Sequence, residues 1–239
     1  MKAAVVTDLG KLEVLDLPMP ELGPYDVLCR MCYGSTCAGT DIHLMDGQHP
    51  YPVTFPTVLG HESVGRVVEL GAKVKNYKLG DLVSRVGYPG DAKSGVFSNW
   101  GGFAEYGIAK DHWQMRRDGV EESQWTKYRV NQNIHPAIDE KTAPMIITWR
   151  ETLSYDRRIG IGAGTRLLLI GSGANALAHC ANAVNLGAEV TVVGSGKRRD
   201  DFEKLAICAF HNYRDEKLAE NVLEQHRGEK FDMILDGVG

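Results

Sequence analysis

The chain has 239 residues, which suits one large domain or two small ones, and its 43% hydrophobic content is enough to build packed cores. Lys and Arg number 27 against 31 Asp and Glu, so the formal charge of −4 gives no global field for nucleic acid or acidic membranes. We therefore expect no nucleic acid and no membrane as partners. The chain opens directly as a strand with no leader, has no apolar stretch long enough to span a bilayer and carries five cysteines, an odd number. We therefore expect reduced thiols and a cytoplasmic location.

The first part of the chain, up to about residue 107, reads as a series of short strands separated by Gly, Pro and Asp. The predicted strands are rich in β-branched and aromatic residues and cover residues 3–6, 12–17, 27–33, 63–70, 82–86 and 103–108. This pattern predicts a β-rich, barrel-like domain with long loops. The polar run 116–133 is predicted to be a surface insertion.

From residue 140 onward, helices and strands alternate. After a helical stretch, the predicted elements are a strand at 166–170, a helix at 174–186, a strand at 189–193, helices near 200–209 and 216–225, and a strand at 231–235. Alternating βα units predict a parallel sheet covered by helices. We therefore expect two domains, residues 1–150 and residues 151–239.

A glycine-rich turn opens the predicted helix at 174–186. The apolar strand Leu167–Ile170 leads into Gly171-Ser172-Gly173-Ala174-Asn175-Ala176, which is the context that a dinucleotide-binding turn requires. Gly171 would form the tight turn, Gly173 would let the backbone approach a pyrophosphate, and Ala176 would allow close helix packing. A tight βα turn without a ligand is the alternative.

The end of the next strand should select the cofactor. An acidic residue that would bind a ribose diol is missing, and Gly194-Ser195-Gly196-Lys197-Arg198-Arg199 follows the strand instead. A hydroxyl and cations suit a 2′-phosphate, so Gly194, Ser195, Arg198 and Arg199 favour NADP(H) over NAD(H). A solvated charged loop is the alternative.

Four candidate zinc ligands are spread along the chain: Cys37, His61, Glu62 and Glu151. Zinc prefers Cys, His and carboxylate donors, and a catalytic site leaves one position open. Taken singly, each has a plainer interpretation as a small buried thiol, a core histidine or a solvated acid. Cys29 and Cys32 lie three apart in a strand, so their thiols should diverge, and we interpret them as packing residues.

Several motifs occur in the order found in one family. They are Gly60-His61-Glu62 with Gly65 and Gly71, Gly80-Asp81-Leu82-Val83, Gly101-Gly102-Phe103-Ala104-Glu105-Tyr106, Glu151-Thr152-Leu153-Ser154 and the dinucleotide turn. Over nearly its whole length the chain resembles the zinc-dependent medium-chain alcohol and polyol dehydrogenases. The resemblance implies an α/β fold, with an N-terminal β-rich GroES-like barrel domain followed by a partial Rossmann domain, a doubly wound parallel sheet.

The same resemblance implies the chemistry. His61 would bind zinc, Glu62 would stand at or near the metal, and Glu151 would supply a third ligand. Zinc would act as a Lewis acid for hydride transfer between an alcohol, polyol or sugar hydroxyl and the nicotinamide. Thr40 would pass the alcohol proton through the cofactor ribose to His43. Alternatively, Thr40 and Asp41 cap a short helix and His43 is solvated.

The chain departs from the family pattern at three places. Ala38 stands where the ligand cysteine usually precedes Gly-Thr-Asp, and a one-residue bulge would restore Cys37 as a ligand. The segment Tyr88–Ser94 contains no cysteine in place of the family's structural zinc lobe, so we expect one catalytic zinc and no structural zinc. Only twenty positions separate Glu151 from Gly171, so the helix that links them is expected to be about one turn shorter than in sorbitol dehydrogenases.

The end of the chain, residues 232–239, reads as a strand and the start of its loop, whereas a complete dinucleotide fold has about six strands. We therefore expect a truncated or incomplete form of a longer enzyme, inactive alone, with an exposed strand edge, and homo-oligomeric when complete. Two other functions stay open: a zinc-free quinone or enone reductase of the same fold, and an inactive nucleotide-binding or interaction fragment.

Overall fold

The structure is a computed structural model that describes residues 1–226 and 228–238, with only the backbone described for Ala38. The chain divides into two compact units, Met1–Ile147 and Thr148–Gly239.

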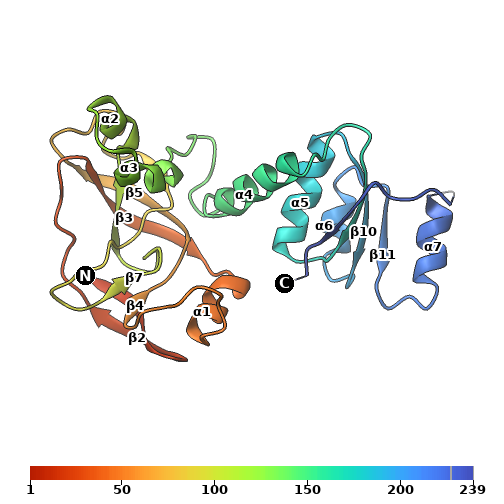
Figure 1. The fold of residues 1–239 in the computed structure, drawn as a ribbon, viewed down its shortest axis with the longest axis horizontal. Helices are drawn as coiled ribbons and strands as arrows, with labels where there is room; N and C mark the ends of the chain where they lie inside the picture. The colour runs from red at the N-terminus through yellow and green to blue at the C-terminus, as the bar shows by residue number, and fades with distance from the viewer. Residues whose placement is uncertain (227, 239) are drawn as a thin grey trace. The chain divides into compact units, whose positions relative to one another are not determined.

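The first unit is built mainly from short strands (Figure 1). They are β1 (Lys2–Asp8), β2 (Lys11–Asp16), β3 (Asp26–Ser35), β4 (Thr57–Val58), β5 (Glu62–Leu70), β6 (Leu82–Ser84), β7 (Phe97–Ser98) and β8 (Tyr106–Lys110). They form two four-stranded sheets with the orders β2-β1-β4-β7 and β6-β5-β3-β8. Apolar residues such as Val5, Val27 and Val83 are fully buried. Consecutive residues are buried in β3, β5 and β6, so both faces of their sheet are covered there, since successive side chains of a strand point to opposite faces.

Short helical segments complete this unit. They are η1 (Ala38–Ile42), α1 (His43–Met45), α2 (His112–Arg117), α3 (Glu122–Trp125) and η2 (Thr126–Val130). The prediction that residues 116–133 are a surface insertion was wrong, because Trp125 is buried and Asn131 donates to the carbonyls of Ser84 and Arg85. The segment is part of the fold. Two predicted strands also differ in their bounds. β6 ends at Ser84, because Arg85 has φ +55°, and β8 covers Tyr106–Lys110 instead of residues 103–108.

The second unit is a parallel sheet with helices on both sides. Its strands are β9 (Arg166–Ile170), β10 (Glu189–Gly194), β11 (Ala209–Asn212) and β12 (Met233–Asp236), in the order β11-β10-β9-β12. Its helices are α4 (Met145–Arg158), which begins in the first unit, α5 (Ala174–Asn185), α6 (Arg199–Glu203) and α7 (Leu218–Gln225). Figure 1 shows α5 and α7 on opposite sides of the strands. The predicted GroES-like β-rich domain and Rossmann-type parallel sheet are confirmed.

The packing of α5 explains its small residues. Ala176, Cys180 and Ala183 lie four and three positions apart, so they share one face, and all three are fully buried. Burial raises the pKa of the Cys180 thiol to about 12, so this cysteine packs as an apolar group. Small side chains let the helix approach β9 and β10 closely.

One predicted element of this unit was wrong. The helix expected near residues 200–209 ends at Glu203, and β11 follows it. The strand forms because the Cys208 N–H donates to the Val190 carbonyl and Phe210 enters the core. β11 then pairs in parallel with β10, with Gly194 opposite Asn212.

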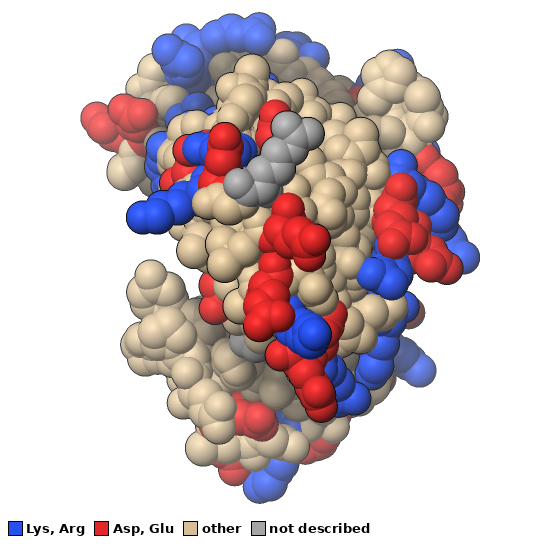
Figure 2. Space-filling view, turned by 90° about the vertical axis from the view of Figure 1, so that its right-hand side faces the viewer, with Lys and Arg blue, Asp and Glu red and all other residues tan. Residues whose placement is uncertain are grey.

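Charged side chains of both signs are mixed on the surface. On the face that Figure 2 presents, blue and red groups lie beside one another in several clusters, with wide areas of uncharged surface between them. This mixture agrees with the nearly balanced counts of basic and acidic residues. Among residues 1–226 and 228–238, no helix combines the length and the apolar character that a bilayer crossing needs.

Candidate functional site

The turn that carries Cys37 and Thr40 is organised by a buried carboxylate. Asp41 is 5% exposed, and its Oδ2 accepts a hydrogen bond from the Cys37 backbone N–H at 2.9 Å. In return, the Cys37 carbonyl accepts from the N–H groups of Thr40 and Asp41 at 3.1 and 2.8 Å. Cys37 is extended and half-buried, and it stands at the start of η1.

His61 is buried beside this turn. It follows Gly60, whose φ is +99° and where a Cβ would lie only 2.8 Å from Phe103 Cδ1, so glycine is required there. His61 Nδ1 lies 3.8 Å from Asp41 Oδ1, too far for a hydrogen bond, and neither buried atom has a hydrogen-bond partner. The His61 ring also lies 5.2 Å from the Trp100 ring, measured between centroids. A histidine and a carboxylate therefore face each other with unsatisfied polar atoms.

The other residues predicted for catalysis and metal binding differ in burial. Glu62 is buried at the start of β5, Thr40 is half-buried in η1, and His43 is exposed at the start of α1. Glu151 lies exposed on α4 and belongs to the second unit. Within residues 1–226 and 228–238, no three His, Cys, Asp or Glu side chains are grouped so that they could hold a metal ion. Asp41 thus contacts the Cys37 backbone and lies near the His61 ring, but within the described residues these side chains form no three-donor group.

The glycine-rich turn has the geometry that a dinucleotide needs. Gly171 has φ +122°, and a Cβ there would lie 3.0 Å from the carbonyl carbon and oxygen of Gly237. A Cβ on Gly173 would meet nothing within 4 Å, and the first residues of α5 are exposed. Ala176 is fully buried, and a Cβ on Gly237 would lie 3.3 Å from the Ala176 Cβ. Gly171 and Ala176 are therefore fixed by packing, whereas the space beside Gly173 is open.

The end of β10 touches this turn through hydroxyl groups. Ser172 Oγ lies 3.0 Å from Ser195 Oγ and also accepts a hydrogen bond from the Ser195 N–H at 3.0 Å. A Cβ on Gly194 would lie 2.6 Å from the Ser172 Cβ, so glycine is required for this approach. Two serine hydroxyls and the glycine-rich turn consequently share one corner.

The two predicted arginines are in different situations. Arg198 is exposed, and no ion pair involves it in the described parts of the chain. Arg199 Nη2 donates to the Phe210 carbonyl at 2.6 Å, and its Nε lies 3.2 Å from Glu203 Oε1. Arg199 is thus occupied by contacts within the protein, and Arg198 is the better placed of the two to meet a ligand.

Sequence reasoning missed Tyr213 and Arg214, because it did not recognise β11. The Tyr213 N–H donates to the Gly194 carbonyl at 3.0 Å, which places this segment at the end of β10. Arg214 Nε donates to the Tyr213 hydroxyl at 3.0 Å, and Tyr213 is exposed. A strand prediction at Ala209–Asn212 would have found them, since carboxyl ends of neighbouring parallel strands lie together.

The comparisons with known proteins agree with this geometry. Residues 23–118 match the family described as the alcohol dehydrogenase GroES-like domain. An alcohol dehydrogenase of Cupriavidus necator is 26% identical over 260 aligned positions, which cover 100% of this chain and 70% of that protein. Residues 23–118 thus form a GroES-like domain of the alcohol dehydrogenase type, and the chain as a whole is similar to alcohol dehydrogenases.

Solved structures of medium-chain oxidoreductases have the same fold. One from Sinorhizobium meliloti 1021, described as a zinc-binding dehydrogenase bound to NADP, has a TM-score of 0.78 at 22% identity. The match covers 100% of this chain and 70% of the Sinorhizobium chain. A quinone oxidoreductase of Pseudomonas syringae pv. Tomato DC3000 has a TM-score of 0.74 at 21% identity, with 100% and 67% covered. At these identities the likeness concerns the fold alone.

Proposed function

We propose that this protein transfers hydride between NADP(H) and the carbon of an alcohol or carbonyl substrate. The observation that carries the proposal is the corner where the Gly171 turn meets Ser172 and Ser195. A helix N-terminus beside an open glycine suits the pyrophosphate, and the exposed loop after β10 suits the adenosine ribose. The substrate is proposed to be a small alcohol, polyol or sugar.

The cofactor preference follows from the groups after β10. No carboxylate stands at Gly194 to bind a ribose diol, while the Ser195 hydroxyl and the exposed Arg198 can donate to a phosphate. Tyr213 and Arg214 add a hydroxyl and a guanidinium at the neighbouring strand end. Guanidinium groups match phosphate oxygens, so we propose NADP(H) rather than NAD(H).

A zinc ion is part of the leading proposal. His61 fits a metal-binding histidine, because its buried Nδ1 faces Asp41 Oδ1, and ligating histidines usually have their other ring nitrogen oriented by a carboxylate. Cys37 and Glu62 are the other proposed donors of the first unit, and the resemblance also gives Glu151 of the second unit a ligand role. Zinc, when bound, supplies a Lewis acid that polarises the substrate oxygen.

The proton of the alcohol needs an acceptor within the protein. Thr40 is half-buried in the turn that Asp41 fixes, and the exposed His43 follows it after Ile42. As the resemblance implies, we propose that the Thr40 hydroxyl takes up this proton while it gives up its own toward His43, which releases a proton to solvent. The expectations of a homo-oligomer and of a cytoplasmic location stay predictions.

A zinc-free quinone or enone reductase is the second candidate. It is favoured by the arrangement of the described residues, which contain no three-donor group. Ala38 also occupies the position where the family usually has its ligand cysteine. In this case the chain would bind NADPH and reduce a conjugated carbonyl without a metal.

Metal analysis and activity assays of the full-length protein separate the candidates. After purification with zinc supplementation, about one zinc per chain together with oxidation of alcohols by NADP supports the leading proposal. No bound metal together with NADPH-dependent reduction of enones or quinones supports the second. Two zinc ions per chain would contradict the one-zinc proposal, and a protein that binds neither NADP(H) nor NAD(H) would be the inactive form.

A further inference from the structure

A second polar cluster lies in the second unit, at the point where the strand order reverses. The order β11-β10-β9-β12 runs backward from β9 to β11 and then continues on the other side with β12. Ligands of open α/β sheets bind outside the carboxyl ends of the strands at such a switch point. A cavity of about 660 Å³ is present there, lined by residues of α4, by His179 of α5 and by Leu235 and Asp236 at the end of β12.

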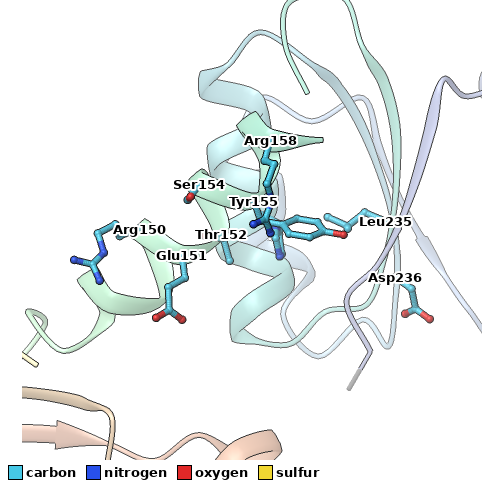
Figure 3. A pocket seen from close by; sticks show the side chains of 9 residues that line it. Arg150, Glu151, Thr152, Ser154, Tyr155, Arg158, Leu235 and Asp236 are labelled. Atoms are coloured by element: carbon cyan, nitrogen blue, oxygen red, sulfur yellow. The ribbon is translucent and has the colours of Figure 1, made fainter. Parts of the chain in front are cut away.

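Figure 3 shows part of the lining of this cavity. Tyr155 reaches from α4 toward Leu235, and Glu151 of α4 and Asp236 after β12 lie on either side of it, both below it in this view. The charged lining residues include two arginines, Arg150 and Arg158, and these two acids, so the signs are balanced. A balanced lining with an aromatic ring and an aliphatic wall favours a flat, neutral polar group over an ion.

His179 is held in this wall by a buried carboxylate. Asp156 Oδ1 and His179 Nδ1 are 2.6 Å apart, and the Asp156 side chain is 0% exposed. Asp156 Oδ2 is buried without a hydrogen-bond partner, so His179 is the one side chain that meets this carboxylate in the described residues. The Tyr155 ring packs edge-on against the His179 ring at 6.0 Å between centroids. The imidazole is therefore fixed in both position and orientation.

The contact with Asp156 decides which ring nitrogen meets the cavity. A carboxylate accepts, so Nδ1 carries the hydrogen and Nε2 is the remaining polar atom. Within residues 1–226 and 228–238, Nε2 makes no hydrogen bond, and the His179 side chain, which lines the cavity, is 15% exposed. A histidine that a carboxylate orients in this way, and whose second ring nitrogen has no partner in the described residues, is well suited to bind a ligand.

We propose that His179, positioned by Asp156, hydrogen-bonds the carboxamide of the nicotinamide ring. The inference rests on the proposed function, since it needs NADP(H) as the ligand. The adenosine end is assigned to the end of β10 and the pyrophosphate to the Gly171 turn after β9, so the nicotinamide half continues toward β12 and this cavity. A carboxamide offers both a donor and an acceptor, so it can pair with Nε2 in either protonation state.

The test compares two ligands in the full-length protein. NADPH carries the nicotinamide, whereas 2′-phospho-ADP-ribose lacks it and keeps the other contacts. His179→Asn retains an amide that can donate to Asp156 but has no atom at the position of Nε2. We expect this variant to bind NADPH about 2- to 10-fold more weakly, the worth of one neutral hydrogen bond, and 2′-phospho-ADP-ribose as before. Dihydronicotinamide fluorescence reports the first affinity, and calorimetry reports the second.

A matched control is His226→Ala. His226 Nε2 lies 2.6 Å from Thr191 Oγ1, so it is also a side-chain-bonded histidine of the second unit, but it does not line the cavity. This control should change neither affinity. Equal weakening of both ligands by His179→Asn, or no weakening of NADPH binding, overturns the inference. If the unchanged protein binds 2′-phospho-ADP-ribose but gains nothing from the nicotinamide, the inference fails while the cofactor assignment stands. If it binds neither ligand, both fail.

Discussion

The two turns of this protein that begin with a glycine, Gly60-His61 and Gly171–Ala176, have similar backbones. They differ in how much of the proposed binding site the turn itself supplies. Each begins with a glycine at positive φ. A Cβ at that position would lie too close to a neighbouring side chain, as at Gly60, or to neighbouring backbone, as at Gly171. In the second turn, backbone groups within six residues make the site. In the first, the donors must come from separate segments, and His61 and Asp41 meet with unsatisfied atoms. Sites made of backbone can therefore be recognised locally, whereas sites made of side chains depend on how distant segments meet.

The largest expected effect is the loss of the metal from the first turn. His61→Ala should reduce bound zinc from about one per chain to near zero and lower turnover more than about 100-fold, because even residues that only orient ligands are worth 10- to 100-fold. Elemental analysis and steady-state assays of the full-length protein measure both. His135→Ala, an exposed histidine of the same unit, is the control and should change neither. Retention of metal and turnover in His61→Ala would remove His61 from the metal site.

The two glycines of the second turn should respond differently. Gly171→Ala forces a Cβ to 3.0 Å from Gly237 at φ +122°, so we expect it to unfold the second unit more easily, by about 1–3 kcal/mol. Gly173→Ala has φ −78° and open space, so it should leave the melting temperature unchanged and still weaken NADP(H) binding. Thermal unfolding and cofactor titration measure the two effects. A Gly173→Ala protein that binds NADP(H) normally would mean that no ligand approaches there.

The next effect concerns the two arginines after β10. Arg198→Ala should lower the preference for NADP over NAD by about 1.5–3 kcal/mol, the worth of a charge-assisted hydrogen bond. Arg199→Ala should change this preference less and should lower the melting temperature, because Arg199 binds the Phe210 carbonyl and Glu203. Affinities for both cofactors in both variants decide the matter. If neither variant changes the ratio of affinities, the assignment of NADP is wrong.

The smallest effect on function is expected at Asp111. Both of its carboxylate oxygens accept hydrogen bonds, whereas Oδ1 of Asp41 has no hydrogen-bond partner. Burial acts to raise the pKa of Asp111, but hydrogen bonds from the N–H groups of Lys75, Asn76 and Gln114 outweigh it and leave the pKa below its usual value. The carboxylate therefore stabilises the folded state above pH about 4, and this contribution is lost as the pH falls through the lowered pKa.

Asp111→Asn should thus reduce the free energy of unfolding of the first unit by about 1.5–3 kcal/mol near neutral pH and leave cofactor affinity unchanged. Denaturant unfolding at a series of pH values measures this. The difference between variant and unchanged protein should shrink below pH about 4. A constant difference down to pH 2 would show that the charge of Asp111 contributes nothing.

Much of the fold could be predicted from sequence, because strand alternation and the βα rhythm are local patterns. β9 was predicted with its observed bounds, and α5 to within one residue. β11 was missed because it is short and follows a charged helix, and it is recognisable only through its pairing with β10. The buried Trp125 shows the same limit, since neighbouring polar residues concealed one large side chain that packs in the interior.

The candidate site was predictable only where its geometry comes from the chain's own backbone. The roles of Gly171 and Ala176 agree with their packing, and Ser195 lies beside the turn as a phosphate-binding group should. The contacts of Arg199, in contrast, depend on β11 and could not be foreseen without that strand. The Asp156–His179 pair joins α4 to α5 across 23 positions, and no local pattern marks such a pair.

The close approach of Gly171 and Gly237 also limits how this pocket can be redesigned. A Cβ on Gly171 would lie 3.0 Å from Gly237, and one on Gly237 would lie 3.3 Å from Ala176 Cβ, so a side chain at either position would crowd the floor of the proposed cofactor site. The exposed loop at Ser195, Lys197 and Arg198 is different, because changes at surface positions usually alter stability by no more than about 0.5 kcal/mol. The cofactor preference can therefore be changed in this loop without disturbing the packed glycines. A small library of variants confined to the loop should be enough to exchange one nicotinamide cofactor for the other.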